Sequence, residues 1–392
     1  MNYVLFDDEP VRRRLLPFTF TRPVCEIRIG ILTIREKWEY ELKQQVSIKT
    51  EDYLSAKFPL QASKKEDTVW INGCLLPNGG LVKQIMSLKP GESINNGLMT
   101  IAVNSGKEPF EKINLKKKGK TIKAEGNNSI QHNWDIFSLN GLAIEEDFTR
   151  LTRGKKSATV SKTNTILGKK VFIEKGAKLE CAILNSTTGP IYIGKNAEVM
   201  EGSVIRGPFA LCEDSTIKAG AKIYGPTTIG PHSKVGGEVS NSVIFGYSNK
   251  AHDGFMGNSV IGEWCNLGAD TNTSNLKNNY SKVSIYDFTS ERMVSTGLTF
   301  CGLMMGDHSK CGINTMFNTG TVVGVCANVF GGNFPPKYIP SFSWGGASGF
   351  AAYEFDKAVE TATRVYERRH KEFDRVEEEI LKTIYYTLAS NP

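Results

Sequence analysis

The chain has 392 residues, of which 40% are hydrophobic and 23% are charged, and its formal net charge is +7. These values predict two domains with ordinary hydrophobic cores and exclude a largely disordered chain. There is no apolar run of the ~20 residues that a membrane-spanning helix needs, and no basic leader followed by an apolar core at the N-terminus. The eight cysteines form no C-x-x-C pair. We therefore expect a cytoplasmic protein with reduced thiols and no membrane association.

The first 150 residues have the pattern of an α/β domain. Strands are expected at 3–6, 68–71 and 98–103, and helical stretches such as 31–43 alternate with them. The most specific string in this region reads RRLLPFTFTRP and spans 13–23. It resembles the signature of sugar-1-phosphate nucleotidylyltransferases, with Arg14, Pro17, Thr19 and Pro23 at matching positions.

In that family, backbone amides and an arginine hold the phosphates of a nucleoside triphosphate. The resemblance therefore implies that Arg14, Thr19 and Arg22 bind a nucleotide or sugar phosphate, with Mg²⁺ as the accompanying ion. The first loop, 6–12, contains no glycine, and Val24 stands where the family has a lysine. Two interpretations stay open: a compact active nucleotidylyltransferase, and a shortened relative that only binds a sugar nucleotide.

Much of the net positive charge lies in a lysine-rich segment near residue 120. Its lysines are Lys112, Lys116, Lys117, Lys118, Lys120 and Lys123. We interpret the segment as a solvated loop, because a nucleic-acid interface normally interleaves aromatic side chains with such cations. No nucleic-acid partner is expected.

A six-residue period begins after residue 165. Aliphatic side chains recur at this interval, with small residues four positions later; the unbroken run is Ile193, Val199, Ile205, Leu211, Ile217, Ile223, Ile229 and Val235. The pattern predicts short strands that stack as coils of a parallel β-helix over about 165–332, because each coil can bury its apolar face only against its neighbours. A sandwich of short strands would alternate with period two instead.

The period is interrupted between 240 and 300; it returns first as Ile261 and Leu267, and then as Met305, Cys311, Phe317, Val323 and Val329. Insertions between coils gather on one face of such an array, which is often the binding face. Chemistry is therefore expected in the interrupted stretch.

The last forty residues have apolar side chains at helical spacing from Phe355 to Leu388. This spacing predicts one long amphipathic helix that shields the open edge of the last coil. Pro335, Pro336 and Pro340 precede it and are expected to end the β-helix.

A nucleotidylyltransferase-like domain followed by a hexapeptide β-helix is the plan of the bifunctional N-acetylglucosamine-1-phosphate uridyltransferase and glucosamine-1-phosphate acetyltransferase family. The whole chain resembles a divergent bacterial branch of it, through strings such as KAHDGFMGNSVIG at 250–262 and GDHSK at 306–310. The resemblance implies a left-handed β-helix, a homotrimer, and three parts at 1–150, 151–345 and 346–392. It also implies an enzyme that uses acetyl-CoA, an amino-sugar phosphate and a nucleoside triphosphate.

Two residues of the interrupted stretch match positions with a role in that family. His252 falls on the catalytic histidine, and imidazole suits a proton acceptor because its ordinary pKa lies near physiological pH. Asn275 matches an asparagine that binds substrate. Leu276 and Asp270 differ from the family, which leaves the acceptor sugar open.

Three further residues are candidate ligands of substrate phosphates: Lys250, His308 and Lys310. The first adjoins His252, and the other two form a His-Ser-Lys string at a coil edge.

Two other classes of protein remain as alternatives. One is a non-catalytic trimeric scaffold that binds a sugar nucleotide. The other is a zinc-dependent hydratase, in which three histidines from two subunits hold the metal. His232 and His252 are 20 residues apart, close to one coil, but no third ligand is evident in the sequence. We therefore predict no metal site.

Overall fold

The computed structural model describes residues 1–97, 99–113, 120–121 and 128–388. Most of the lysine-rich segment lies outside the described residues. By their contacts, the residues form two units. Unit 1 comprises 1–15, 21–27 and 32–132, and unit 2 comprises 16–20, 28–31 and 133–392. Contacts thus group 133–150 with the β-helix, whereas the limits 1–150, 151–345 and 346–392 stay a prediction for the functional domains.

Unit 1 is an α/β unit built on a six-stranded mixed sheet of order β2-β1-β3-β5-β4-β6. The strands expected near 3, 68 and 98 are β1, β3 and β5, although residue 98 itself lies outside the described residues. The elements are β1 (Asn2–Phe6), α1 (Glu9–Arg14), α2 (Ile34–Leu42), β2 (Ser47–Lys49), β3 (Thr68–Asn72), α3 (Gly79–Met86), β4 (Ser93–Asn95), β5 (Thr100–Asn104) and β6 (Lys120–Thr121). Helix α2 begins with a Thr33–Glu36 capping box, which fixes its start.

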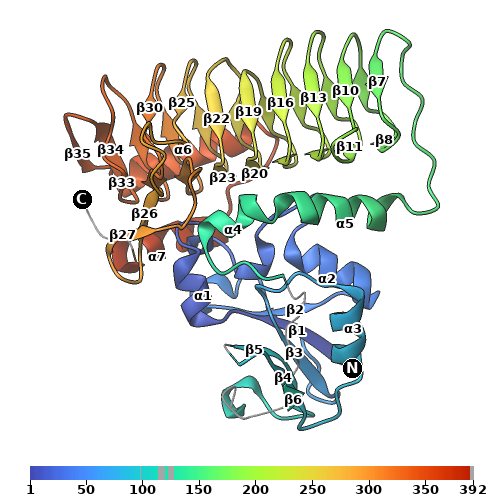
Figure 1. Ribbon diagram of the computed structural model, residues 1–392. Coiled ribbons are helices and arrows are strands. Elements are labelled where there is room, and N and C mark those ends of the chain that lie inside the picture. Colours follow the sequence, from blue (N-terminus) through green and yellow to red (C-terminus); the bar gives the residue numbers. More distant parts are fainter. Residues whose placement is uncertain (98, 114–119, 122–127, 389–392) are drawn as a thin grey trace. The chain divides into compact units, whose positions relative to one another are not determined.

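Unit 2 is a left-handed parallel β-helix with three faces (Figure 1). The first face contains β7 (Thr165–Leu167), β10 (Ile183–Asn185), β13 (Val204–Arg206), β16 (Lys222–Tyr224), β19 (Glu238–Ser240), β22 (Phe255–Gly257), β25 (Asn272–Thr273) and β30 (Met316–Phe317). The second face contains β8 (Val171–Ile173), β11 (Ile191–Ile193), β14 (Phe209–Leu211), β17 (Thr227–Ile229), β20 (Val243–Gly246), β23 (Val260–Glu263), β28 (Met304–Met305), β31 (Val322–Val323) and β33 (Tyr338–Ile339). The third face contains β9 (Lys178–Leu179), β12 (Glu198–Val199), β15 (Thr216–Ile217), β18 (Lys234–Val235), β21 (Asn249–Lys250), β24 (Asn266–Leu267), β29 (Lys310–Cys311), β32 (Asn328–Val329), β34 (Ser343–Gly346) and β35 (Gly349–Ala352).

The six-residue period is confirmed as the inner ladder of the β-helix. The eight aliphatic residues from Ile193 to Val235 are each at most 1% exposed. Successive members lie on successive faces, so that Ile193 pairs in register with Leu211, and Leu211 with Ile229. Three hexapeptides therefore make one coil, and stacked coils supply each other's core.

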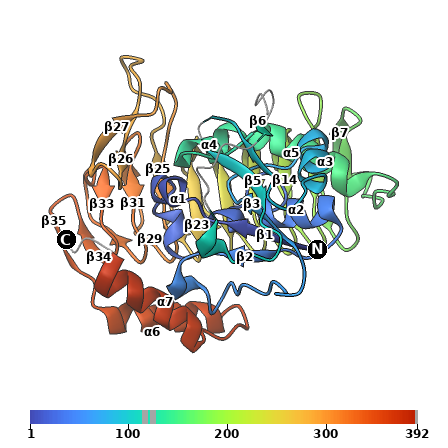
Figure 2. The same ribbon diagram turned by 90° about the horizontal axis from the view of Figure 1, so that it is seen from below.

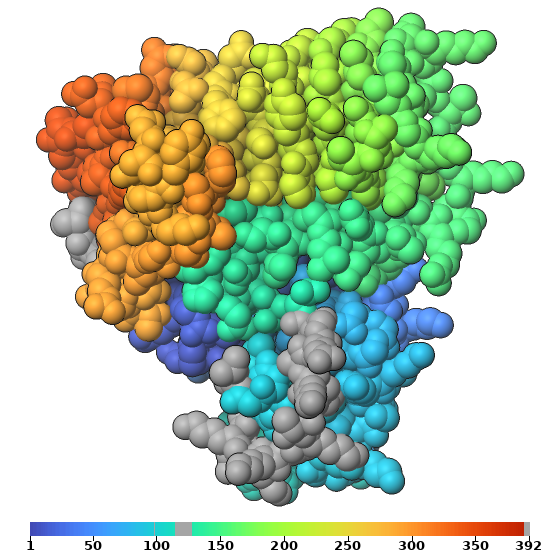
Figure 3. All heavy atoms as spheres, viewed as in Figure 1, coloured from blue at the N-terminus to red at the C-terminus, as the bar shows by residue number. Residues whose placement is uncertain are grey.

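The stretch 240–300 is less interrupted than the sequence indicates. Strands β19 to β25 continue all three faces through it. The period is lost because some coils are shorter: Ile217 pairs with Val235 after 18 residues, but Val235 pairs with Lys250 after 15. The true insertion is a hairpin of β26 (Ser284–Asp287) and β27 (Arg292–Ser295). Figure 3 shows this insertion, in light orange, standing out from the coils.

The expected end of the β-helix at the proline-rich segment is wrong. Strand β33 pairs in parallel with β31, and β34 with β32, so one more coil follows Pro335 and Pro336. The prolines precede or follow β33 rather than lying within it, so they remove no ladder hydrogen bond there.

The expectation of one long C-terminal helix is also wrong. Helix α6 (Phe355–Glu367) and helix α7 (Arg375–Thr383) are separate, and a π-helical turn (Ile384–Leu388) follows. His370 has a left-handed backbone with φ 54°, which ends α6, and the Asp374 side chain accepts a hydrogen bond from Glu377 N at 2.9 Å, which starts α7. Figure 2 shows both helices beside β29 and β34.

The second face is covered by α4 (Asn133–Ser138) and α5 (Asn140–Thr152). The fully buried Asn140 side chain accepts from Gly30 N at 2.7 Å and is hydrogen-bonded to Thr228 of β17 at 3.0 Å. Asp147, also fully buried, accepts from Ile31 N at 2.9 Å. These bonds explain why α5 and 28–31 group with the β-helix.

Candidate functional site

His252 lies on the turn that joins β21 of the third face to β22 of the first face. Its side chain is exposed. The turn is held from inside by Lys250, whose Nζ donates to the carbonyl oxygens of Gly236 at 3.2 Å, His252 at 2.7 Å and Asp253 at 3.2 Å. The imidazole is therefore accessible to solvent while its backbone is anchored.

Lys250 itself takes a core position. It is 1% exposed and pairs in register with Val235 of the inner ladder. Burial lowers the pKa of its ammonium group to about 8, against the opposing effect of Asp253. The structure thus gives Lys250 a place beneath the His252 turn, with its three hydrogen bonds directed at backbone carbonyls.

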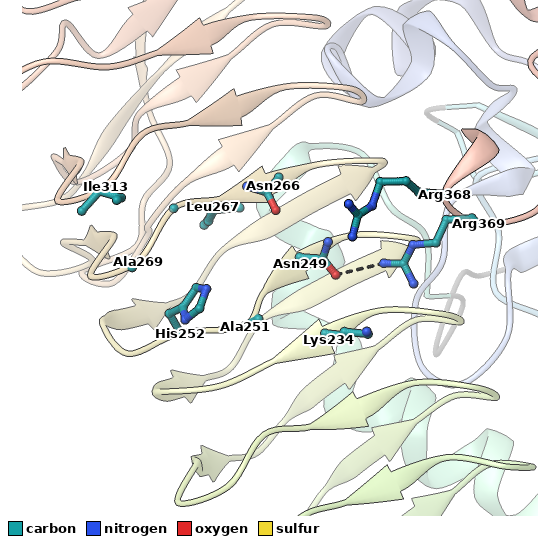
Figure 4. Close-up of a pocket in the computed structure, with 11 residues that line it drawn as sticks. Lys234, Asn249, Ala251, His252, Asn266, Leu267, Ala269, Ile313, Arg368 and Arg369 are labelled. Carbon is teal, nitrogen blue, oxygen red and sulfur yellow. Dashed lines mark hydrogen bonds between the residues drawn. The ribbon is translucent and has the colours of Figure 1, made fainter. Parts of the chain in front are cut away.

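A pocket of about 450 Å³ lies on the outer side of the third face and includes His252 (Figure 4). Its basic residues are Lys234 from β18 and Arg368 and Arg369 from the end of α6. The remaining lining residues are Asn249, Ala251, Asn266, Leu267, Gly268, Ala269 and Ile313. The lining contains cations and amides but no carboxylate, so the pocket favours anionic ligands.

Asn275 lies at a different corner of the β-helix from His252. It follows β25 of the first face, where the chain leaves the coils for the insertion. Its Nδ2 donates to Asn258 Oδ1 at 2.8 Å, and its carbonyl oxygen accepts from Cys301 N at 2.9 Å. Within one chain, the structure does not bring Asn275 and His252 into one pocket.

His308 lies at the corner that leads into the third face, and Lys310 follows it in β29, in register with Asn266. His308 belongs to a row of rings, with centroids 6.4 Å from Trp264 and 6.1 Å from Tyr366, and it is 7% exposed. Lys310 Nζ donates to His308 O at 2.8 Å, and burial lowers the pKa of this lysine. Both residues contribute to packing beneath α6, and neither lines the pocket of His252.

Of the three candidate residues in 13–23, Arg14 and Arg22 belong to unit 1 and Thr19 belongs to unit 2. Arg14 in unit 1 donates through Nε to Gln131 O at 3.1 Å and through Nη2 to Gln131 Oε1 at 2.9 Å. Arg22, also in unit 1, is 6% exposed. Thr19 is fully buried in unit 2, where its neighbours Phe18 and Phe20 contact Phe245 and Phe288.

The loop after β1 contains a buried carboxylate, that of Asp7. Asp7 accepts from Val24 N at 2.8 Å and from the Thr50 hydroxyl at 2.6 Å, and it lies 3.5 Å from Arg12 Nε. Burial raises the pKa of Asp7 to about 6 against these interactions. Donors that could meet a phosphate in this loop therefore already bind a carboxylate.

The same loop does not fit Mg²⁺ well. Both carboxylate oxygens of Asp7 accept hydrogen bonds, and Asp8 Oδ2 accepts from Asn72 Nδ2 at 3.3 Å. In the described part of the chain, no three His, Cys, Asp or Glu side chains are grouped so that they could hold a metal. A zinc site of the hydratase kind would need ligands from another copy of the chain.

Comparison with known proteins agrees with this architecture. Residues 3–156 match the sugar nucleotidyl transferase family. A bifunctional GlmU protein of Methanocaldococcus jannaschii is 30% identical over 252 residues, which are 64% of this chain and 50% of that protein. A bifunctional sugar-1-phosphate nucleotidylyltransferase/acetyltransferase of Sulfurisphaera tokodaii is 29% identical over 146 residues, or 37% of this chain and 36% of that protein.

These matches support a divergent GlmU-like family for the chain. It spans about half the length of the curated relatives that it matches. An uncharacterised acetyltransferase of Escherichia coli K12, YaiX, is 29% identical over 143 residues, which are 36% of this chain and 61% of that protein.

Among solved structures, the polysialic-acid-specific acetyltransferase NeuO matches 54% of this chain and 99% of its own, at 13% identity and a TM-score of 0.26. None of the described helices has the length and hydropathy needed to cross a membrane. All eight cysteines are free, and seven of them are buried.

Two lining residues of the pocket in this GlmU-like protein were missed by sequence reasoning. Arg368 and Arg369 belong to a segment that was expected to continue a helix, in which adjacent arginines are ordinary solvated residues. Their place at the pocket is set by the packing of the end of α6 against β21, where Arg369 Nη2 donates a hydrogen bond to Asn249 Oδ1 at 3.0 Å.

Proposed function

We propose that unit 2 transfers an acetyl group from acetyl-CoA to the amine of an amino-sugar phosphate. The observation that carries the proposal is an exposed His252 on an anchored turn, at the edge of a pocket with three cationic side chains, in a GlmU-like chain. The same family supports a homotrimer in the cytoplasm that takes part in UDP-sugar or dTDP-sugar synthesis.

The reaction needs a proton acceptor and an uncharged amine. The amine nitrogen attacks the thioester carbonyl carbon, the new C–N bond forms, and the C–S bond breaks. His252 accepts the proton that the nitrogen loses, and the coenzyme A thiolate takes a proton as it leaves. Imidazole is suited to this exchange because it changes charge near neutral pH.

The test is substitution of His252 in the full-length protein. We expect His252→Asn to lower the rate of acetyl transfer to glucosamine-1-phosphate or another hexosamine-1-phosphate by about 10²- to 10⁴-fold, the usual contribution of general acid–base catalysis. Release of the coenzyme A thiol gives the rate. His370→Asn is the matched control, because His370 has a left-handed backbone that asparagine tolerates and does not line the pocket.

Two results would contradict this function. Equal rates in the parent and His252→Asn would remove His252 from the chemistry. Absence of transfer from acetyl-CoA to every hexosamine phosphate, in a parent that still binds sugar nucleotides, would favour the non-catalytic scaffold.

A second activity, sugar-1-phosphate nucleotidylyl transfer by unit 1, is favoured by the family match over residues 3–156. Arg14 is its phosphate-binding candidate, whereas the Asp7 carboxylate in the first loop tells against a bound triphosphate. Pyrophosphate release from UTP or dTTP with a sugar-1-phosphate tests it. We expect Arg14→Ala to abolish release and Arg13→Ala, an exposed arginine of the same helix, to leave it unchanged. If Arg14→Ala releases pyrophosphate as fast as the parent, Arg14 does not bind the phosphates.

A further inference from the structure

Another pocket, of about 510 Å³, lies at the end of the β-helix where the coils begin, beside β8 (Figure 1). It is lined by the segment after α5 and by the first two coils, through Lys155, Lys156, Ala158, Phe172, Ile173, Glu174, Lys175 and Lys195. None of these residues lines the pocket of His252. On the third face, β9 at this end and β21 before His252 are four strands apart, roughly 19 Å at the ordinary strand spacing. The two pockets are therefore separate sites.

The chain around this pocket is strongly basic. Of the 26 residues in 153–178, eight are Lys or Arg, and one, Glu174, is acidic. The formal charge of this short segment is thus +7, as large as the net charge of the whole chain. Three of its lysines line the pocket together with Lys195 of the next coil. Such a concentration of one charge raises the local concentration of anions.

The fold brings these lysines together by adding an edge segment to the first coil. Ala158 N donates to Ile173 O at 2.7 Å, and Ile173 N donates to the Ser157 hydroxyl oxygen at 2.9 Å. Residues 155–158 therefore lie along β8. Two lysines of the edge segment are thereby held beside the coil that carries Lys175.

The single carboxylate of the lining does not neutralise the lysines. The Glu174 carboxylate is hydrogen-bonded to the Tyr192 hydroxyl, and burial together with this bond raises the pKa of Tyr192. The Tyr192 ring in turn stacks on Phe172, with 6.1 Å between centroids and 5° between planes. In the described part of the chain, no ion pair joins any of the four lining lysines to a carboxylate. The pocket thus carries four ammonium groups whose charge the protein does not balance.

Charge and volume together indicate the kind of ligand. Lysine ammonium groups bind phosphate oxygens as point charges with several donors. A single phosphate carries a charge of about −2 at neutral pH, so four ammonium groups match an anion with two phosphates. The volume is typical of a small-molecule site. A nucleic acid would need a longer basic surface with interleaved aromatic side chains.

We propose that this pocket is a second ligand site, which binds a small anion with two linked phosphate groups, such as a nucleoside diphosphate or a nucleotide sugar. The inference does not depend on acetyl transfer at His252. A ligand bound there would contact both the edge segment 155–158 and the first coils. It should therefore stabilise the start of the β-helix and raise the Tm.

The test is calorimetric titration of the full-length chain without added Mg²⁺, which would compete for the phosphates. Inorganic pyrophosphate, UDP, UDP-N-acetylglucosamine and UMP are titrated into the parent and two double variants, Lys155→Gln with Lys156→Gln and Lys175→Gln with Lys195→Gln. We expect each double variant to weaken pyrophosphate binding by about ten- to a hundredfold, the usual effect of losing charge-assisted hydrogen bonds. All four lysines are exposed, so their substitution should leave the fold intact. Lys178→Gln is the control, an exposed lysine of the same coil outside the pocket.

The ligands distinguish the sources of the diphosphate. Lysine-dependent binding that is equal for pyrophosphate and UDP supports a site for the diphosphate alone, and tighter binding of UDP or UDP-N-acetylglucosamine supports a nucleotide site. Equal affinity in the parent and both double variants overturns the proposal and assigns the binding to another part of the chain. Absence of saturable binding by the parent also overturns it. If the variants instead lose binding to a DNA oligonucleotide, the lysines serve a polyanion and the proposal is wrong.

Discussion

Lys250 is the residue at which the β-helix departs from its own core pattern. It occupies the inner ladder beside Val235, and its ammonium group meets three carbonyl oxygens of the turn that carries His252. A buried cation costs free energy unless it is hydrogen-bonded. Here the three hydrogen bonds offset that cost and hold the backbone of the turn. We expect Lys250 to position His252 rather than to touch substrate.

The prediction at the residue scale concerns pH. Since the pKa of Lys250 falls from 10.5 to about 8 on folding, the folded chain binds fewer protons than the unfolded chain between these values. Its contribution to the free energy of unfolding therefore rises with pH in that window, by on the order of 3 kcal/mol. Lys250→Met should lack this rise and should lower kcat for acetyl transfer more than it changes KM.

Urea unfolding at pH 7.5, 9 and 10.5 measures the effect on stability. Lys178→Met, an exposed lysine of β9 on the same face, is the control and should keep the parent's pH dependence. If Lys250→Met also keeps the parent's pH dependence of unfolding, Lys250 is not the buried charge that causes it.

At the scale of elements, the β-helix depends on close approach of consecutive coils. A Cβ added at Gly230 would lie 1.9 Å from the carbonyl oxygen of Phe245 in the next coil. Only glycine leaves room for that contact, because backbone rather than a flexible side chain fills the space. Glycine is therefore required at this corner because of the spacing between consecutive coils.

Gly230→Ala should consequently destabilise the coils. We expect a loss of about 1–3 kcal/mol in the free energy of unfolding, the usual cost of overpacking, with a lower Tm in a thermal scan. Gly332→Ala is the matched control, because nothing lies within 4 Å of a Cβ at that position. Equal melting of the two variants would show that the coils can move apart at little cost.

At the scale of the whole molecule, the three faces of the β-helix are covered unequally. Helix α5 contacts β14 and β17 of the second face, and α6 and α7 lie along the third. The first face keeps Ile183, Val204 and Tyr224 exposed, at 40%, 37% and 40%. Parallel sheets are normally buried on both sides, so this apolar surface fits a subunit interface.

We therefore predict that the chain forms a homotrimer through the first face. Sedimentation equilibrium should give three times the chain mass, and Val204→Asp should shift the mass toward that of one chain, because a charge on the apolar face would be desolvated. Leu60→Asp, at a comparably exposed leucine of unit 1, should leave the trimer intact. A monomeric parent at micromolar concentration would contradict the interface.

The parts of the fold that depend on local repetition were predictable. The ladder from Ile193 to Val235 and the strands β1, β3 and β5 follow from periodicity that a linear sequence displays directly. Prediction failed where a coil changes length, as between Val235 and Lys250, because a shortened corner shifts the period without ending the ladder. It also failed at His370, whose left-handed backbone divides the C-terminal helix.

The sequence by itself determined that an α/β region is followed along the chain by a β-helix, and it singled out His252 through a local motif. Only the tertiary structure decided which candidates share a pocket. Lys250 points inward, His308 belongs to a row of rings, and Asn275 lies at another corner. Arg368 and Arg369, more than a hundred residues away in the sequence, line the same pocket as His252. Periodicity reports which side chains face a common core, whereas a site joins residues that are close only after the coils stack and α6 packs against them.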